Sequence, residues 1–141
     1  MPAFWDTSAI IHLCVPGQST AAARRILSQH PPVVWWAARV EVLSALERVR
    51  RESAITPKAY GASRARLEAL LVSWREIQPS EPLRDLACVQ LERFDIRAAD
   101  AFQLAAALIW CKQNPRGRLF VCNDRRLGEA ARQASFSVDS V

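Results

Sequence analysis

The sequence contains little glycine and no glycine-rich phosphate-binding motif. Only four glycines occur among 141 residues, and none stands in a G-x-G-x-x-G or P-loop arrangement, so nucleotide-cofactor binding has no support. There is also no G-x-S-x-G motif and no cysteine–histidine motif of a covalent hydrolase. Any chemistry must therefore come from residues dispersed along the chain.

Paired cysteines and long apolar runs are missing too. The four cysteines form no C-x-x-C pair, which excludes an obvious zinc knuckle or disulfide framework, and we expect them to be small buried hydrophobes. These cysteines are Cys14, Cys88, Cys111 and Cys122. No apolar run approaches the roughly 18 residues of a membrane helix, and Met1 to Asp6 lacks the order of an export signal. We therefore expect a soluble, cytoplasmic protein that does not associate with membranes.

Lysine is scarce, although the chain is basic. The 19 basic residues are 17 arginines, Lys58 and Lys112, and the formal net charge is +5 with a pI of about 9.6. Guanidinium groups bind phosphate bidentately, so this composition favours a nucleic-acid partner moderately. Arginines on solvated helix faces explain it equally well, and charge alone does not separate the two interpretations.

Length and hydrophobic patterning predict one α/β domain over residues 1–141. The chain is 50% hydrophobic and 23% charged, as expected for a single domain with its own core. Short apolar runs predict strands at Ala3–Trp5, Val33–Trp36 and Leu119–Cys122, with weaker ones at Glu76–Gln78 and Ser135–Val138. Helical spacing predicts helices at Ser8–Cys14, Thr20–Gln29, Arg39–Ser53, Pro57–Trp74, Leu83–Phe94, Ala99–Cys111 and Arg126–Gln133. This order predicts a central, mainly parallel sheet of four to five strands with helices on both faces.

Side chains outside the chemistry also yield expectations. The helical insert between the second and third strands is rich in arginine, and we expect it to project as an arm. Among its arginines are Arg48, Arg50, Arg51, Arg64 and Arg66. The tryptophans are expected in the core, and His12 and His30 in structural or surface roles.

Four acids occupy similar positions relative to the predicted elements. Asp6 follows the first strand, Glu41 lies in the first turn after the second, Asp100 opens a helix, and Asp124 comes two residues after the fourth strand. Each alone is explained by helix capping or by the helix dipole. In a parallel sheet, however, ligands bind beyond the carboxyl ends of the strands, where all four can meet. Carboxylates so close repel one another unless a cation bridges them.

An all-oxygen ligand set selects Mg²⁺ or Mn²⁺ over zinc or copper. Such a site suits phosphodiester hydrolysis, because the cation neutralises charge on the phosphoryl and leaving oxygens while water attacks phosphorus. Glu41 or Asp100 is expected to orient or deprotonate that water, and the sequence does not decide between them. Ser8 is placed to hydrogen-bond a carboxylate, or else simply starts a helix.

Four segments resemble the motifs of PIN domains. Residues Asp6 to Ile11 (DTSAII) resemble their D-x-S opening, and Glu41 to Leu46 (EVLSAL) their second acidic motif. Arg97 to Ala107 resembles the third, and Leu119 to Ala131 the fourth. The match runs almost end to end and is most similar to VapC-like toxins of type II toxin–antitoxin modules. It implies a PIN-like three-layer α/β/α fold.

The resemblance also implies an activity. It predicts a Mg²⁺- or Mn²⁺-dependent endoribonuclease acting on transfer or ribosomal RNA, usually a homodimer, neutralised by a cognate VapB-like antitoxin. The implied catalytic and metal-binding residues are Asp6, Glu41, Asp100 and Asp124. Cys122 departs from the Thr or Ser that the family often places two residues before the last acid, and Asn123 is the expected polar substitute.

Other uses of these features stay open. Arg39, Arg97, Arg125 and Arg126 are candidate RNA-binding residues, or they pair with surface acids. A housekeeping PIN nuclease of RNA maturation is one alternative to a toxin. A non-catalytic RNA- or protein-binding module is another, although clustered acids do not help a surface to bind RNA.

Overall fold

The chain alternates short strands with helices, as the patterning predicts. The computed structural model describes residues 1–141. The strands are β1 (Ala3–Trp5), β2 (Pro32–Trp35), β3 (Arg75–Ile77), β4 (Leu119–Cys122) and β5 (Ser137–Ser140). The helices are α1 (Thr7–Cys14), α2 (Thr20–Gln29), α3 (Ala38–Arg51), α4 (Pro57–Ser73), α5 (Glu81–Arg93), α6 (Ala98–Trp110) and α7 (Arg125–Gln133).

All five strands are parallel, in the order β3-β2-β1-β4-β5. From β1 the chain adds β2 and β3 on one side and then returns to add β4 and β5 on the other. The strand order therefore switches between β1 and β4, with Phe4 opposite Phe120 in the register. Ligand sites of open α/β sheets form at such a switch point.

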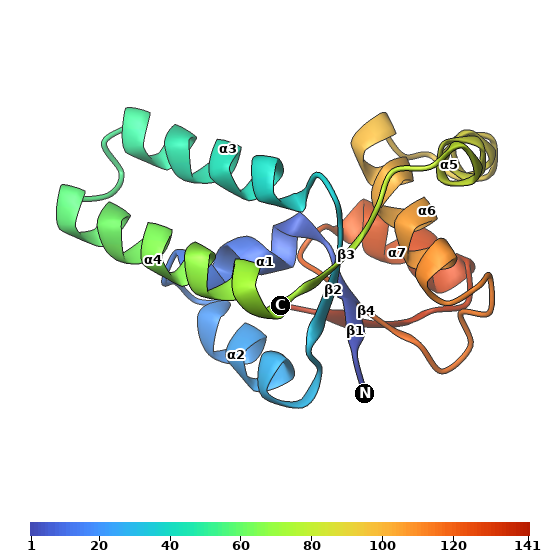
Figure 1. Ribbon diagram of the computed structural model, residues 1–141, viewed down its shortest axis with the longest axis horizontal. Helices are drawn as coiled ribbons and strands as arrows, with labels where there is room; N and C mark the ends of the chain where they lie inside the picture. Colours follow the sequence, from blue (N-terminus) through green and yellow to red (C-terminus); the bar gives the residue numbers. More distant parts are fainter.

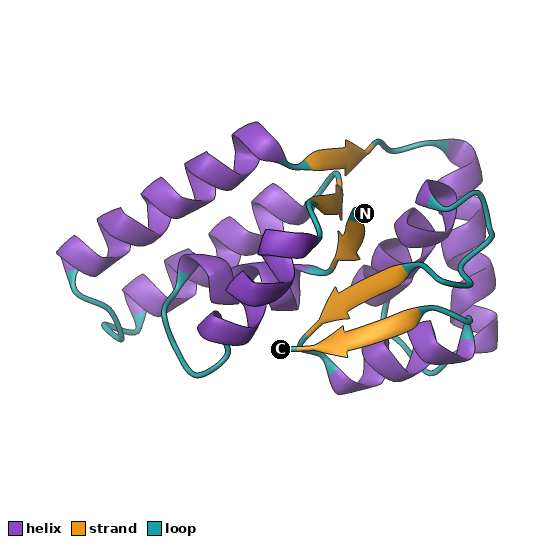
Figure 2. Cartoon of the chain, turned by 90° about the horizontal axis from the view of Figure 1, so that it is seen from below, coloured by secondary structure: helices purple, strands orange, loops and turns teal.

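Two hydrophobic cores cover the two faces of the sheet, because alternate strand residues point to opposite sides. Trp5 packs with the first four helices, whereas Phe4 packs with the last three. Phe4 stacks on Phe120 with ring centroids 5.4 Å apart. Figures 1 and 2 show these two helix groups on either side of the strands. The predicted three-layer α/β/α architecture is confirmed.

Side-chain caps set most helix starts. Asp6, Thr56, Ser80 and Asp124 each accept a hydrogen bond from a backbone N–H two or three residues later, which satisfies a free donor of the first turn. The predicted helices agree with the observed ones to within two residues at either end. The last strand begins at Ser137, later than predicted, because Ser135 has a φ of 80° and forms the turn that ends α7.

Two packing predictions are wrong at single positions. Cys88 lies on the outer side of α5 and is exposed, while the other three cysteines are buried. Trp36 was expected in the second strand and the core, but β2 ends at Trp35 and the Trp36 side chain is 50% exposed. A buried strand that ends one residue earlier leaves the next side chain at the sheet edge.

The arginine-rich insert forms a pair of helices, α3 and α4, that extends away from the strands (Figure 1). Glu47 ties the pair together, because it accepts a hydrogen bond from Tyr60 and pairs with Arg50 at 2.5 Å. The Arg50 guanidinium also lies 5.0 Å from the centre of the Tyr60 ring. None of the helices has the length and apolar character needed to cross a membrane.

Candidate active site

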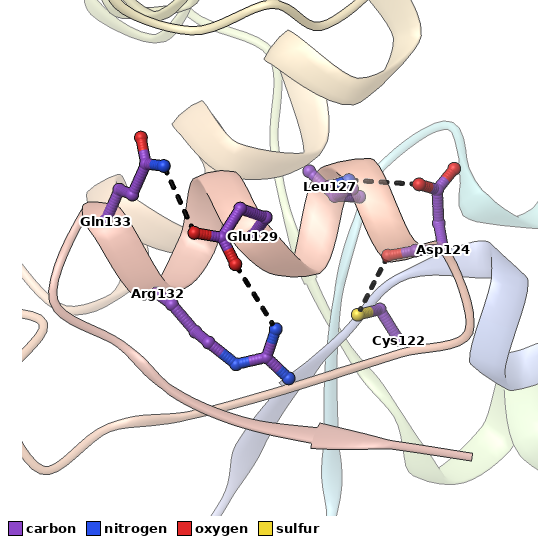
Figure 3. Close-up of polar contacts among 6 residues, drawn as sticks. All are labelled: Cys122, Asp124, Leu127, Glu129, Arg132 and Gln133. Carbon is purple, nitrogen blue, oxygen red and sulfur yellow. Dashed lines mark hydrogen bonds and ion pairs between the residues drawn. The ribbon is translucent and has the colours of Figure 1, made fainter.

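Two of the four acids stand after adjacent strands at the centre of the sheet. Asp6 follows β1 and caps α1, and its backbone N–H donates to the Val121 carbonyl of β4 at 2.9 Å. Asp124 follows β4 and caps α7, with Oδ1 accepting from the Leu127 N–H at 2.9 Å (Figure 3). The strand order thus holds both residues at the carboxyl edge, beside the switch point.

Glu41 and Asp100 approach this edge from opposite faces, in the first turns of α3 and α6. Gln103, one turn after Asp100, links the two faces. Its Nε2 donates to Glu41 Oε1 at 3.0 Å and to Thr7 Oγ1 at 3.1 Å, and the residue is only 1% exposed. This amide joins α6 to α1 and α3 and holds one oxygen of Glu41.

The four carboxyl groups influence one another electrostatically. Burial, opposed by the hydrogen bonds from Ser8 and assisted by the charges of Asp100 and Asp124, raises the pKa of Asp6 to about 6. Burial and then the charge of Asp6 raise the pKa of Glu41 to about 7. Burial and the charge of Asp124 also raise the pKa of Asp100. The structure therefore brings all four predicted acids to one edge.

None of these acids has an ion-pair partner. The salt bridges of the structure, within 4.0 Å, involve other acids, namely Glu47, Glu68, Asp85 and Glu129. A buried carboxylate such as Asp6, beside like charges and without a cation, is electrostatically unfavourable. The charges of Arg126 and Arg97 act to lower the pKa of Asp100, but neither arginine forms a salt bridge with an acid of this edge.

The chemistry of this donor set fits Mg²⁺ or Mn²⁺, since it consists of carboxylate oxygens. The side chains do not form a ready coordination shell, because no group of three or more His, Cys, Asp or Glu is arranged to hold one metal ion.

The fold, but not the sequence, matches known proteins. No family model and no curated protein matches the chain. A toxin–antitoxin complex from Klebsiella pneumoniae matches over 86% of each chain, with TM-score 0.61 and 17% identity. VapC20 of Mycobacterium tuberculosis, a sarcin–ricin loop cleaving toxin, matches over 91% of this chain and 94% of its own, with TM-score 0.61 and 21% identity. A protein from Pyrobaculum aerophilum matches over 98% and 89%, with TM-score 0.65 and 18% identity. The chain has a PIN-like fold.

Ser8 is a structural link of the PIN-like fold at the acidic edge. Its hydroxyl donates to Asp6 Oδ2 at 2.5 Å and accepts from the Asn123 N–H at 2.7 Å. The Asn123 side chain instead turns to His12, with Nδ2 2.6 Å from Nε2. Ser8 thus connects the segment after β1 with that after β4, and Asn123 contributes through its backbone.

Cys122 occupies a tight space in this PIN-like fold. Its thiol lies 3.6 Å from the Asp124 backbone carbonyl (Figure 3), and burial raises its pKa to about 11. A Cβ placed on Gly128 would lie 3.1 Å from this sulfur. The glycine therefore lets α7 approach β4 closely, which positions Asp124.

The candidate RNA-binding arginines do not all lie at the acidic edge of the PIN-like fold. Arg97 and Arg126 line a cavity of about 410 Å³ together with Asp100 and Asp124. Arg125 lines the neighbouring cavity. Arg39 is exposed in the first turn of α3 and lines neither.

The sequence reasoning assigned no role to Gln103. A signal exists, because it is the one polar residue of the apolar stretch Ala101–Trp110 and lies one turn from Asp100. Its contact with Glu41 depends on the meeting of helices from the two sheet faces, which spacing along the chain does not predict.

Proposed function

We propose that this chain is a Mg²⁺- or Mn²⁺-dependent endoribonuclease, with Asp6, Glu41, Asp100 and Asp124 as its catalytic and metal-binding residues. The observation that carries the proposal is the convergence of these acids without ion-pair partners at the switch point of the sheet. Helix capping accounts for Asp6 and Asp124 singly, but not for the convergence of four acids without ion-pair partners, which favours a function that uses a cation.

The four acids would hold the cation, and its binding would draw their carboxylates together. When bound, the cation neutralises charge on the phosphoryl oxygens and on the leaving oxygen. Glu41 is the acid that we assign to accept a proton from the attacking water. Its Oε1 is held by Gln103, and a general base must be oriented towards the proton that it accepts.

We further propose that the enzyme is a toxin that cleaves transfer or ribosomal RNA, forms a homodimer and is neutralised by a VapB-like antitoxin. Support comes from the four motifs and from the folds matched. One neighbour is a toxin that cleaves the sarcin–ricin loop, and another is a toxin in complex with its antitoxin. A role in RNA maturation and a non-catalytic binding module are the competing functions.

The decisive experiment is cleavage of a total small-RNA pool by purified protein with Mg²⁺ or Mn²⁺, beside a chelator control. Asp6→Asn and Asp100→Asn keep the side-chain shape and remove the charge. We expect metal-dependent fragments that disappear in both variants. Activity that survives in the variants would place the catalytic centre elsewhere.

Growth separates a toxin from a maturation nuclease. Expression of the wild type is expected to arrest growth, and co-expression of its antitoxin to restore it. We expect an antitoxin arginine to enter among the acids, because the edge is negatively charged and unpaired. Inhibition that is unchanged after removal of that arginine would contradict this mode of neutralisation.

A further inference from the structure

A second cavity adjoins the acidic edge between the end of α5 and the start of α7. Its volume is about 620 Å³, and its lining includes Arg93, Phe94, Arg125 and Arg126. Arg126 also lines the cavity that contains Asp100 and Asp124, so the two are adjacent. The volume lies in the range of about 300–1,000 Å³ typical of small-ligand pockets.

The arginines of this cavity have no acidic partner. Arg93, Arg125 and Arg126 take part in none of the salt bridges. Asp95 and Glu129 also line the cavity. Glu129 is already engaged on its own helix, since it lies 3.7 Å from the Arg132 guanidinium and accepts from Gln133 at 3.1 Å (Figure 3). Three arginines without salt bridges therefore line the cavity, and guanidinium groups bind phosphate.

Phe94 adds an aromatic surface to the charge. It ends α5, is half-buried against the core, and has the Arg93 guanidinium 4.9 Å from its ring centre. Unstacked bases of single-stranded RNA stack on both aromatic rings and guanidinium planes. Stacking groups and phosphate-binding groups thus lie together in one cavity. Arg126 lines both this cavity and the one that contains Asp100 and Asp124.

We propose that this cavity binds a nucleotide of single-stranded RNA next to the scissile phosphate, with the base stacked at Phe94 and Arg93 and the phosphate held by Arg125 and Arg126. The inference rests on the proposed ribonuclease function. It adds that the nucleotide next to the cleaved bond is unpaired in the RNA substrate. Base-paired RNA keeps its bases stacked and does not present one to this cavity.

The test measures binding without cleavage. The probe is a fluorescent ten-nucleotide single-stranded RNA of mixed sequence, titrated by anisotropy in chelator. Arg93→Ala and Phe94→Leu are compared with Arg116→Ala, which removes an exposed arginine from the loop before β4. Thermal melts of each variant establish that it is folded.

We expect Phe94→Leu to raise the Kd for RNA about tenfold, as loss of one stacked base does. Arg93→Ala should also raise the Kd and reduce the salt dependence of binding by about one phosphate contact. Arg116→Ala should match the wild type, and a duplex of the same sequence should be insensitive to Phe94→Leu.

Several results would overturn the inference. Wild-type affinity and salt dependence in folded Arg93→Ala and Phe94→Leu would do so, as would no RNA binding by the wild type. Loss of antitoxin binding in these variants with unchanged RNA affinity would make the cavity a protein site instead.

If the variants bind and cleave RNA as the wild type does, the inference fails and the nuclease proposal stands. If RNA binds here but no metal permits cleavage, the nuclease proposal fails.

Discussion

At the scale of single residues, Gln103 is a buried polar side chain in the otherwise apolar part of α6. Its Nε2 holds Glu41, while its Oε1 is buried without a hydrogen-bond partner. A group that orients another side chain in the site is a positioning residue, and its loss affects function more than stability.

We predict that Gln103→Leu lowers kcat/KM for RNA cleavage about 10- to 100-fold, as loss of an outer hydrogen-bonding partner of a metal site does. Its melting temperature should change little, because the unpartnered oxygen disappears with the lost hydrogen bonds. Cleavage rates measured across pH should show a displaced profile, since Glu41 loses a donor.

Gln90→Leu is the matched control. Gln90 is equally buried, also has an unpartnered Oε1, and bonds only to the Leu86 carbonyl within α5. It should retain full activity. Equal activity losses in both variants would mean that Gln103 acts only through packing.

At the scale of elements, the contact between α7 and β4 depends on Gly128. This glycine lies on the buried side of α7 against the Cys122 sulfur, whereas Gly61 lies in α4 with no atom within 4 Å of an added Cβ. Replacement of each glycine by alanine therefore compares a methyl group added in open space with one added in a crowded contact.

Gly61→Ala should raise the free energy of unfolding by about 0.5–1 kcal/mol, because alanine favours the helix over glycine. Gly128→Ala should instead lower the free energy of unfolding by about 1–2 kcal/mol. The new methyl group would crowd the Cys122 sulfur, which cannot move away easily because Cys122 belongs to an interior strand of the sheet. Chemical denaturation of both variants checks this. Equal stabilisation would show that α7 shifts freely and does not fix Asp124.

At the scale of the whole molecule, the acidic edge makes stability depend on pH. The pKa of Asp6 is raised to about 6 in the folded state, so the folded chain retains a proton that the unfolded chain has released. The stability that this carboxyl group contributes is present below a pH of about 4, which is its pKa in the unfolded chain, and is lost as the pH rises through its folded pKa of about 6. Glu41 acts in the same direction.

We predict that Asp6→Asn, which preserves the cap of α1, is more stable than the wild type at pH 8 in chelator, by at most about 3 kcal/mol. The difference should vanish near pH 4. The comparison with wild type cancels His12, whose pKa burial lowers and whose effect has the opposite sign. Mg²⁺ should raise the wild-type melting temperature at pH 8 and raise that of Asp6→Asn less.

Hydrophobic patterning predicts most of this fold, because short buried strands and long amphipathic helices differ in period. It also predicts the position of Asp6 and Asp124, since the first follows a buried strand directly and the second comes two residues after one. It fails for Trp36, where one residue decides between core and solvent, and for Gln103, whose partners come from other elements. Arg39 and Arg126 look alike in sequence and both are exposed, and only the fold shows that Arg126 lines a cavity with Asp100 whereas Arg39 does not.

The strand order has a consequence for synthesis on the ribosome. β1 is translated first, yet its neighbour β4 begins only at residue 119, so the centre of the sheet stays open until late. Asp6 is synthesised early, and the acidic edge is complete only after Asp124 has been added. The acidic edge is thus incomplete until β4 has been synthesised and has paired with β1.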